Sequence, residues 1–126
     1  MEDVRKLAIK TLRSTFKKEG IKIFSSEASF TEEDSPDEYI VVYLISSVYT
    51  AYANGKPIRQ RDSIDVDYYG KNQDQKVLRE PQILKALETV GFRAAERFSD
   101  DGSGSDERGF FYSFANLSIE RVIPDG

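Results

Sequence analysis

The sequence predicts an α+β fold: a mainly antiparallel sheet of four to five strands, two helices packed on one face, and a protruding β-hairpin. Three observations lead to this fold class. Two segments carry apolar residues at helical spacing, and several others show the alternation or the β-branched and aromatic enrichment of strands. An Asn-Gly dipeptide, the preferred centre of a two-residue hairpin turn, joins two of these strand segments.

The first predicted element is an amphipathic helix over residues 2–19. Acidic residues occupy its first turn and lysines its last, which matches the helix dipole, and Gly20 is a suitable residue to end it. The apolar stripe consists of Val4, Leu7, Ala8, Leu12 and Phe16, with Ile9 at its edge.

A short apolar alternation follows at residues 21–24 and is a candidate strand. The segment 25–38 is then polar and acidic and contains Pro36, so we predict a long exposed loop. Loops of this length in a compact domain are usually functional.

The strongest strand signal lies at residues 39–49, where apolar and aromatic side chains occupy both alternating faces. Two helices can cover one of these faces. We therefore expect a second copy of the chain or another protein to cover the other. The two sets are Tyr39, Val41, Tyr43 and Ile45 on one face, and Ile40, Val42, Leu44 and Val48 on the other.

Asn54 and Gly55 predict a type I′ turn that pairs residues 49–53 with residues 56–62 as a long ribbon. Pro57 beside the turn suits an edge or a protruding hairpin better than a central strand. Residues 64–69 continue as a half-buried strand with one acidic face.

The second helical segment spans residues 74–90, and Pro81 is expected at the first position of its regular part, which starts near Glu80. Gly91 ends it. Two further strands, at 92–98 and 109–122, are joined by the polar segment SDDGSGSDER. We expect residues 1–126 to form one domain, because this length is typical of single domains.

Composition removes several classes of chemistry. The 126 residues include neither cysteine nor histidine, so disulfides, thiolate metal sites and histidine-based triads are excluded. The net charge is −4 and argues against sequence-independent nucleic-acid binding, although Lys56, Arg59 and Arg61 lie close together. No apolar run reaches the length of a membrane span, and the charged N-terminus predicts cytosolic synthesis rather than secretion.

Asp65 and Asp67 share one strand face, and a carboxylate pair of this kind can hold Mg²⁺ in a nuclease-like enzyme. The simpler interpretation is a solvated strand face that discourages wrong edge pairing. The acidic Gly/Ser loop lacks the spacing of a calcium-binding loop and the context of a phosphate-binding loop. A third hypothesis is an acidic protein-binding adaptor. We expect no catalytic residue, no metal and no cofactor.

The cations of the hairpin and the acids of the 25–38 loop predict a head-to-tail contact between copies, which closes into a ring if the rotation permits. The candidate interface residues are Glu32, Glu33, Asp34, Asn54, Gly55, Arg59, Arg61, Asp65, Asp67, Asp100, Asp101 and Arg108.

Three motifs occur in a specific order: Tyr52-Ala53-Asn54-Gly55-Lys56-Pro57-Ile58, then Val66-Asp67-Tyr68-Tyr69-Gly70-Lys71, then Gly91-Phe92. In this order and spacing the chain resembles, over roughly residues 36–122, the small tail-completion (tail-terminator) and head–tail joining proteins of long-tailed bacteriophages and prophages. The acidic segment 25–38 and the loop SDDGSGSDER depart from that pattern.

The resemblance implies a structural virion assembly protein and no catalytic residues. It implies a ring, hexameric on assembly from a chain that can be monomeric in isolation, which caps the finished tail tube and joins it to the head connector or neck protein. DNA would only pass through the ring lumen. The protein would lie in the virion tail or neck, and in the host cytoplasm during assembly. The departures leave open whether the chain is the terminator itself or a neighbouring neck component.

Overall fold

The structure is a computed structural model, and it describes residues 3–25, 36–94, 98, 105 and 109–123. The elements follow in the order α1 (Val4–Thr15), β1 (Lys22–Ser25), β2 (Glu38–Ala53), β3 (Lys56–Gly70), α2 (Gln73–Glu88), β4 (Arg93–Ala94) and β5 (Phe111–Val122). The fold class predicted from the sequence, α+β with two helices and a five-stranded sheet, is confirmed.

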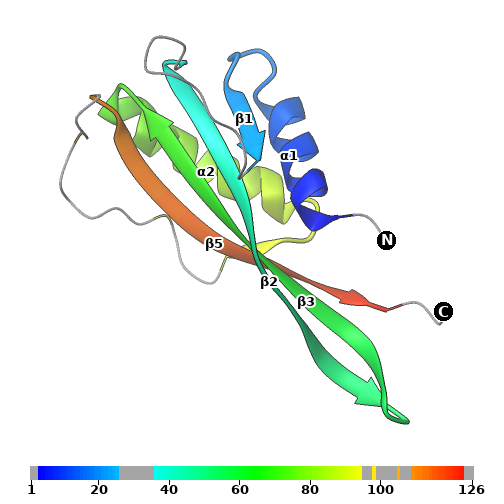
Figure 1. The fold of residues 1–126 in the computed structure, drawn as a ribbon. Helices are drawn as coiled ribbons and strands as arrows, with labels where there is room; N and C mark the ends of the chain where they lie inside the picture. The colour runs from blue at the N-terminus through cyan, green and yellow to red at the C-terminus, as the bar shows by residue number, and fades with distance from the viewer. Residues whose placement is uncertain (1–2, 26–35, 95–97, 99–104, 106–108, 124–126) are drawn as a thin grey trace.

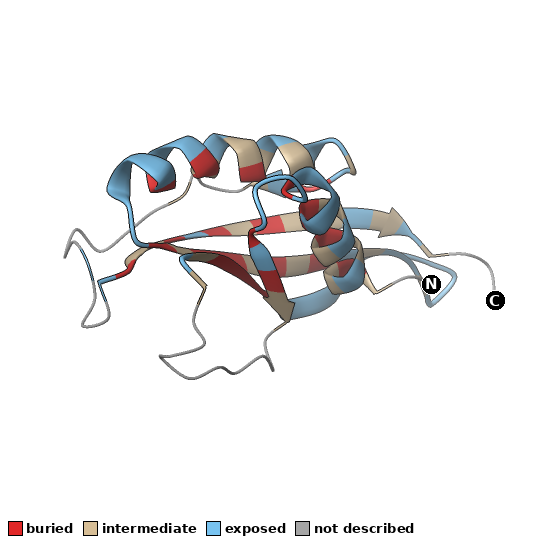
Figure 2. Cartoon of the chain, turned by 90° about the horizontal axis from the view of Figure 1, so that it is seen from above, coloured by how far each residue is buried: buried red, intermediate tan, exposed pale blue. Residues whose placement is uncertain are grey.

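The five strands form one sheet in the order β1-β2-β3-β5-β4. The β1–β2 pair is parallel, and the other pairs are antiparallel, so the sheet is mixed. Both helices lie on one side of the sheet (Figure 2). β2 and β3 are longer than their neighbours and run past the part of the sheet that the helices cover (Figure 1).

The helix α1 is shorter than the predicted 2–19. Asp3 caps it, because its carboxylate accepts a hydrogen bond from the backbone N–H of Arg5 at 2.8 Å. The helix ends at Thr15, and Phe16 leaves the helical conformation with φ −106° and ψ 20°. Phe16 is 2% exposed and packs in the core, and Gly20 then takes a positive φ of 70°. Phe16 thus packs in the core while the chain turns, and the last turn of the predicted helix, up to residue 19, does not form.

The helix α2 begins earlier than the predicted start near Glu80. Asn72 caps it by accepting hydrogen bonds from the N–H groups of Asp74 and Gln75, so the helix starts at Gln73 and Pro81 lies inside it. Pro81 removes the usual donor to the carbonyl of Val77. Both residues are exposed, so water can solvate that carbonyl. The expected position of Pro81 at the start of the helix was therefore wrong.

The end of α2 explains the Gly-Phe motif. Gly91 has φ 106°, a conformation that favours glycine, and the N–H of Phe92 donates to the carbonyl of Leu87 at 3.1 Å. Phe92 is 1% exposed and belongs to the core. The strand that follows is described at Arg93–Ala94, and residues 95–97 of the strand predicted at 92–98 lie outside the described part of the chain.

The main core lies between the helices and the sheet. Alternate residues of the central strands face it, including Ile40 and Val42 of β2 and Ile64, Val66 and Tyr68 of β3. The helices contribute Val4, Ala8, Leu12, Ile83 and Leu87. All of these side chains are at most 3% exposed, so the part of this face that lies under the helices is fully covered.

A buried polar network ties the start of β2 to α2. The Arg79 guanidinium donates from Nε and Nη2 to the two carboxylate oxygens of Glu38, at 3.0 and 3.3 Å. The Tyr68 hydroxyl donates to Glu38 Oε2 at 2.5 Å, and Arg79 also lies 5.8 Å from the centre of the Phe16 ring. The network therefore joins α1, β2, β3 and α2 at one point.

Candidate functional site

The long β2–β3 ribbon, residues 45–61, is called the arm below. Asn54 (φ 52°) and Gly55 (φ 77°) both have positive φ at its tip, as a type I′ turn requires, and the predicted hairpin is confirmed. Its cations Lys56, Arg59 and Arg61 are exposed, and it contains no carboxylate. The arm thus carries a net charge of +3 in a chain of net charge −4, which leaves −7 on the remaining residues.

The arm also exposes large apolar and aromatic side chains. Most of those exposed in the described part of the chain lie on it or at its base: Leu44, Ile45, Val48, Tyr49, Tyr52 and Ile58, between 36% and 62% exposed. Beyond Ile58, where the pairing with β5 ends, the arm is a two-stranded ribbon, which is only marginally stable alone in water, and an apolar patch on it marks an interaction surface.

The base of the arm is held by the buried carboxylate of Asp62. Oδ1 accepts hydrogen bonds from the Ser47 hydroxyl at 2.5 Å and from the Gln60 side-chain amide at 2.7 Å, and Oδ2 pairs with the Arg121 guanidinium. Burial opposes ionisation of Asp62, but these three donors outweigh it and lower its pKa. One carboxylate therefore links β2, β3 and β5 where the arm leaves the helix-covered part of the sheet.

We expect Asp62→Asn to loosen the base of the arm and to lower the free energy of unfolding by about 1–2 kcal/mol, because the ion pair with Arg121 is lost at a buried position. Chemical denaturation measures the stability, and hydrogen exchange at residues 47–61 measures the opening of the arm. Ser63→Ala, on the same strand, is the control. Unchanged exchange in Asp62→Asn would contradict the role assigned to this carboxylate.

The sheet face opposite the helices, called the open face below, is lined by aromatic rings. Tyr39, Tyr69 and Tyr112 are directly opposed across β2, β3 and β5, and their rings are 4.7 and 4.9 Å apart, centre to centre. Phe114 extends this row, 5.8 Å from Tyr112, and is 39% exposed. No described helix or strand lies over this face.

One end of the open face is covered by the chain itself, whereas we had expected a second copy of the chain or another protein to cover this face. Phe110 and Phe24 pack edge-on against Tyr39, at ring distances of 5.5 and 6.2 Å. As a result Tyr39 and Val41 are buried. The uncovered part lies further along the strands, around Tyr43, Asp65 and Phe114.

Asp67 lies within this aromatic surface rather than on a solvated face as predicted, because Tyr69 and Tyr112 surround it. It is 8% exposed; the Tyr112 hydroxyl hydrogen-bonds its carboxylate, and among the described residues its Oδ1 has no hydrogen-bond partner. Burial first, and the nearby Asp65 second, raise the pKa of Asp67 to about 6. The same surroundings raise the pKa of Tyr112 to about 12.

The structure places the predicted interface residues in two groups and leaves the others outside its described part. Asn54, Gly55, Arg59 and Arg61 lie on the arm, whereas Asp65 and Asp67 lie on the open face. The predicted acidic partners of the arm, together with the acids and Arg108 of the Gly/Ser loop, fall outside the described residues: Glu32, Glu33, Asp34, Asp100, Asp101 and Arg108.

The metal hypothesis requires a third ligand near Asp65 and Asp67. Within the described ranges, no group of three or more acidic side chains is placed to hold a metal ion. In that same part of the chain, neither helix is long and apolar enough to span a membrane.

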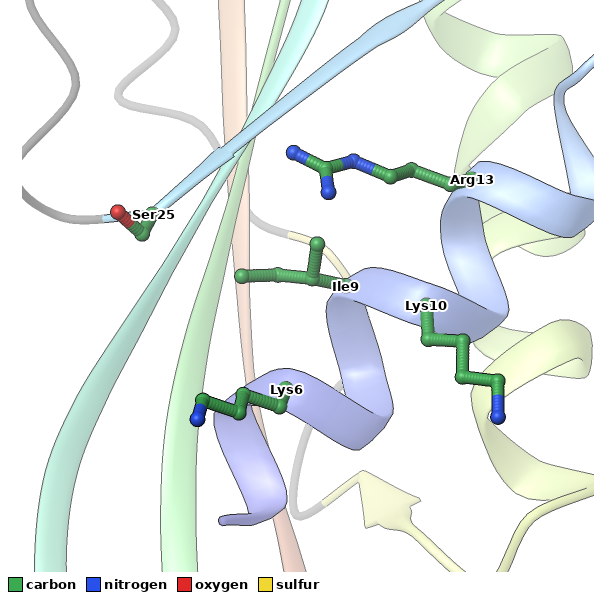
Figure 3. A pocket seen from close by; sticks show the side chains of 5 residues that line it. All are labelled: Lys6, Ile9, Lys10, Arg13 and Ser25. Carbon is green, nitrogen blue, oxygen red and sulfur yellow. The ribbon is translucent and has the colours of Figure 1, made fainter.

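Two features were missed at the sequence level. The tyrosine row was hidden because Tyr39, Tyr69 and Tyr112 are far apart along the chain. A shallow basic pocket of about 420 Å³ lies between α1 and the end of β1 (Figure 3). Its lining residues are Lys6, Ile9, Lys10, Arg13 and Ser25. Arg13 donates to the carbonyl of Ile23 at 3.0 Å, so it holds β1 in place. The spacing of the three cations along one helix face was a signal that could have revealed this pocket.

Comparison with known proteins gives low similarity. No family model matches the chain, and no curated protein matches it. One solved structure is 13% identical, covers 93% of this chain and 96% of its own, and superposes with a TM-score of 0.48. Another is the PVC sheath/tube terminator of an extracellular contractile injection system, 13% identical, with a TM-score of 0.45. It covers all of this chain, which spans 58% of that protein's length. Because both TM-scores are below 0.5, neither structure supports a conclusion about the function of this chain.

Proposed function

We propose that this protein is a structural subunit that closes the end of a phage-type tail tube as a ring of identical copies, and that it acts by assembly rather than by catalysis. The arm is the observation that carries the proposal. It is a protruding ribbon with exposed apolar side chains and a charge opposite to that of the rest of the chain. A surface of this kind serves association, because a monomer gains no stability from exposing it.

The motif order supports the class of assembly. The Asn-Gly hairpin, the Val66–Lys71 strand end and the Gly-Phe pair after α2 resemble tail-completion proteins, and each has a structural basis in the turn, the sheet and the core. On this proposal the partners are further copies of the chain, the tail-tube protein and the head connector or neck protein. The protein would act in the virion tail or neck, after assembly in the host cytoplasm. It needs no metal or cofactor.

The test is association with tail tubes. Purified protein is mixed with tubes that lack their end cap, and electron microscopy measures the fraction of tube ends that carry extra density. We expect the wild-type chain to cap one end. Val48→Ser/Tyr52→Ser should reduce capping at least tenfold, since both side chains lie exposed on the arm, 43% and 62% respectively.

The matched control is Val77→Ser/Leu78→Ser. It removes two exposed apolar side chains, 62% and 54% exposed, from α2 instead of the arm. It should retain capping. Tube ends that stay bare with the wild-type protein at every concentration would refute the proposed function.

A further inference from the structure

We propose that the open face is the receptor for the arm of a second copy of this chain, with Arg59 and Arg61 of one copy on Asp65 and Asp67 of the next. This inference deepens the proposed function and rests on it, because it names the contact through which identical copies associate. It differs from the contact between the arm and the 25–38 loop that the sequence suggested.

The arm and the open face have complementary chemistry. The arm carries three cations, exposed apolar side chains and no carboxylate. The open face carries two carboxylates among aromatic rings, of which Asp65 is half-buried and Asp67 is 8% exposed. A guanidinium can stack on an aromatic ring while it donates two hydrogen bonds to a carboxylate, so arginine suits such a surface better than any other side chain.

The spacing of the two arginines along β3 matches that of the two aspartates. The register between β3 and β5 is uninterrupted from Arg59 to Gly70, so alternation places residues 59, 61, 65 and 67 on the same side of β3. The two arginines are two residues apart, and so are the two aspartates. Each pair therefore spans roughly 7 Å along a strand. A strand laid over the open face can thus satisfy both contacts at once.

The arginines of the arm cannot reach the aspartates of the open face within one copy. Matching Arg59 to Asp65 and Arg61 to Asp67 within one strand would have to span six residues, roughly 20 Å of extended backbone. Neither arginine forms an ion pair with another described residue of its own chain. The contact therefore joins two copies, and where it is made head-to-tail it closes into a ring when the rotation permits.

The open face contains a buried carboxylate oxygen that lacks a hydrogen bond. Asp67 Oδ1 is buried and has no hydrogen-bond partner among the described residues. A buried acceptor of this kind is costly in the free chain. An incoming guanidinium on Asp65 would offset the repulsion between Asp65 and Asp67 and so lower this cost, whereas Asp67 Oδ1 itself is closed to solvent, so the guanidinium acts there through its charge rather than as a hydrogen-bond donor.

Charge exchange tests the contact. The arm variant Arg59→Glu/Arg61→Glu and the face variant Asp65→Arg/Asp67→Asn should each self-associate at least tenfold more weakly than the wild-type chain, because like charges then meet. Mixed in equal amounts, the two variants should co-assemble with affinity restored to within a few-fold, since each arm then meets a face of opposite charge or a neutral partner. Analytical ultracentrifugation measures the association. Circular dichroism and thermal melting verify that each variant is folded.

The matched control for charge is Lys17→Glu/Lys18→Glu, which makes the same change in net charge at exposed positions after α1. It should associate like the wild-type chain. If the control loses association as strongly as the arm variant, or if the mixture fails to restore it while both variants remain folded, the proposed contact is overturned.

A cross-link locates the contact directly, because the chain has no native cysteine. Val48 is paired with Arg61, and Asn116 is paired with Asp65, so Val48→Cys/Asn116→Cys places one thiol beside each half of the contact. Within one copy the two positions are separated by roughly 13 Å along the strand direction alone, too far for a disulfide. Mild oxidation, with and without tail tubes, should give a ladder of linked copies, and Val77→Cys/Asn116→Cys should give none.

The outcomes separate the inference from the proposed function. A ladder without capping of tubes supports the contact and refutes the function. Capping without a ladder under either condition refutes the contact and leaves the function standing. A cross-link from Asn116→Cys to the tail-tube protein instead of a second copy also refutes the contact.

Discussion

Arg79→Ala is expected to lower the free energy of unfolding by about 3–5 kcal/mol, the range observed when one partner of a buried ion pair is removed. The side chains of Arg79 and Glu38 are only 10% and 12% exposed. Without the guanidinium, the Glu38 carboxylate would keep the Tyr68 hydroxyl as a donor but lose both donors from α2. Urea unfolding at pH 7, followed by circular dichroism, measures the loss.

Two further variants separate the charge from the packing. Arg79→Met retains much of the contact with Phe16 but not the charge, so its cost measures the orphaned carboxylate. Glu38→Gln/Arg79→Met removes both charges and should recover part of the lost stability, because no buried charge is then left alone. A loss below about 1 kcal/mol in Arg79→Ala would show that the network does not hold α2 to the sheet.

Local patterns were sufficient for much of this fold. The apolar spacing in residues 4–16 predicted the buried stripe of α1, and Asn54-Gly55 predicted the turn and the pairing of β2 with β3. The apolar side chains on both faces of β2 correctly indicated that the helices would cover one face of this strand, and the expectation that another copy or protein covers the other stays a prediction. These features depend on residues close in sequence, where backbone geometry and alternation are decisive.

Features that depend on distant residues could not be predicted in the same way. Glu38 and Arg79 are 41 residues apart, and nothing in either segment indicates the other. The burial of Asp67 depends on rings from β3 and β5. Pro81 misled because the cap at Asn72, which lies just before α2 and nine residues before Pro81, was a stronger local signal than the expected break. Tertiary packing and capping outweighed residue preference in these cases.

Asp67→Asn is expected to stabilise the isolated chain at pH 7 by about 2–3 kcal/mol. The pKa of Asp67 is raised to about 6 in the fold, from an ordinary value of 3.8. Each unit of this difference corresponds to about 1.4 kcal/mol in favour of the protonated form. Asparagine presents the shape of the neutral acid and retains an acceptor for the Tyr112 hydroxyl, so it avoids the cost of the buried charge.

The sign of the pH dependence follows from proton binding. Between pH 4 and 6 the folded chain holds a proton on Asp67 that the unfolded chain has released, so stability falls as pH rises through this window. The other groups that face Asp67 are Asp65, Tyr43, Tyr69 and Tyr112. The three tyrosines remain protonated there, because their pKa values are raised. Unfolding measured from pH 4 to 8 should show this decline in the wild-type chain and a flatter profile in Asp67→Asn.

Asp65→Asn is the matched control, because it removes the neighbouring charge but leaves the buried one. Its gain should be smaller, since burial contributes more than Asp65 to the raised pKa. Equal profiles of stability against pH for the wild-type chain and Asp67→Asn would contradict the free-energy cost assigned to this buried charge. A residue that weakens the free chain is retained when assembly uses it. Asp67→Asn should therefore give a more stable monomer that self-associates more weakly. A gain in stability together with a loss of association distinguishes an interface carboxylate from one that is merely buried.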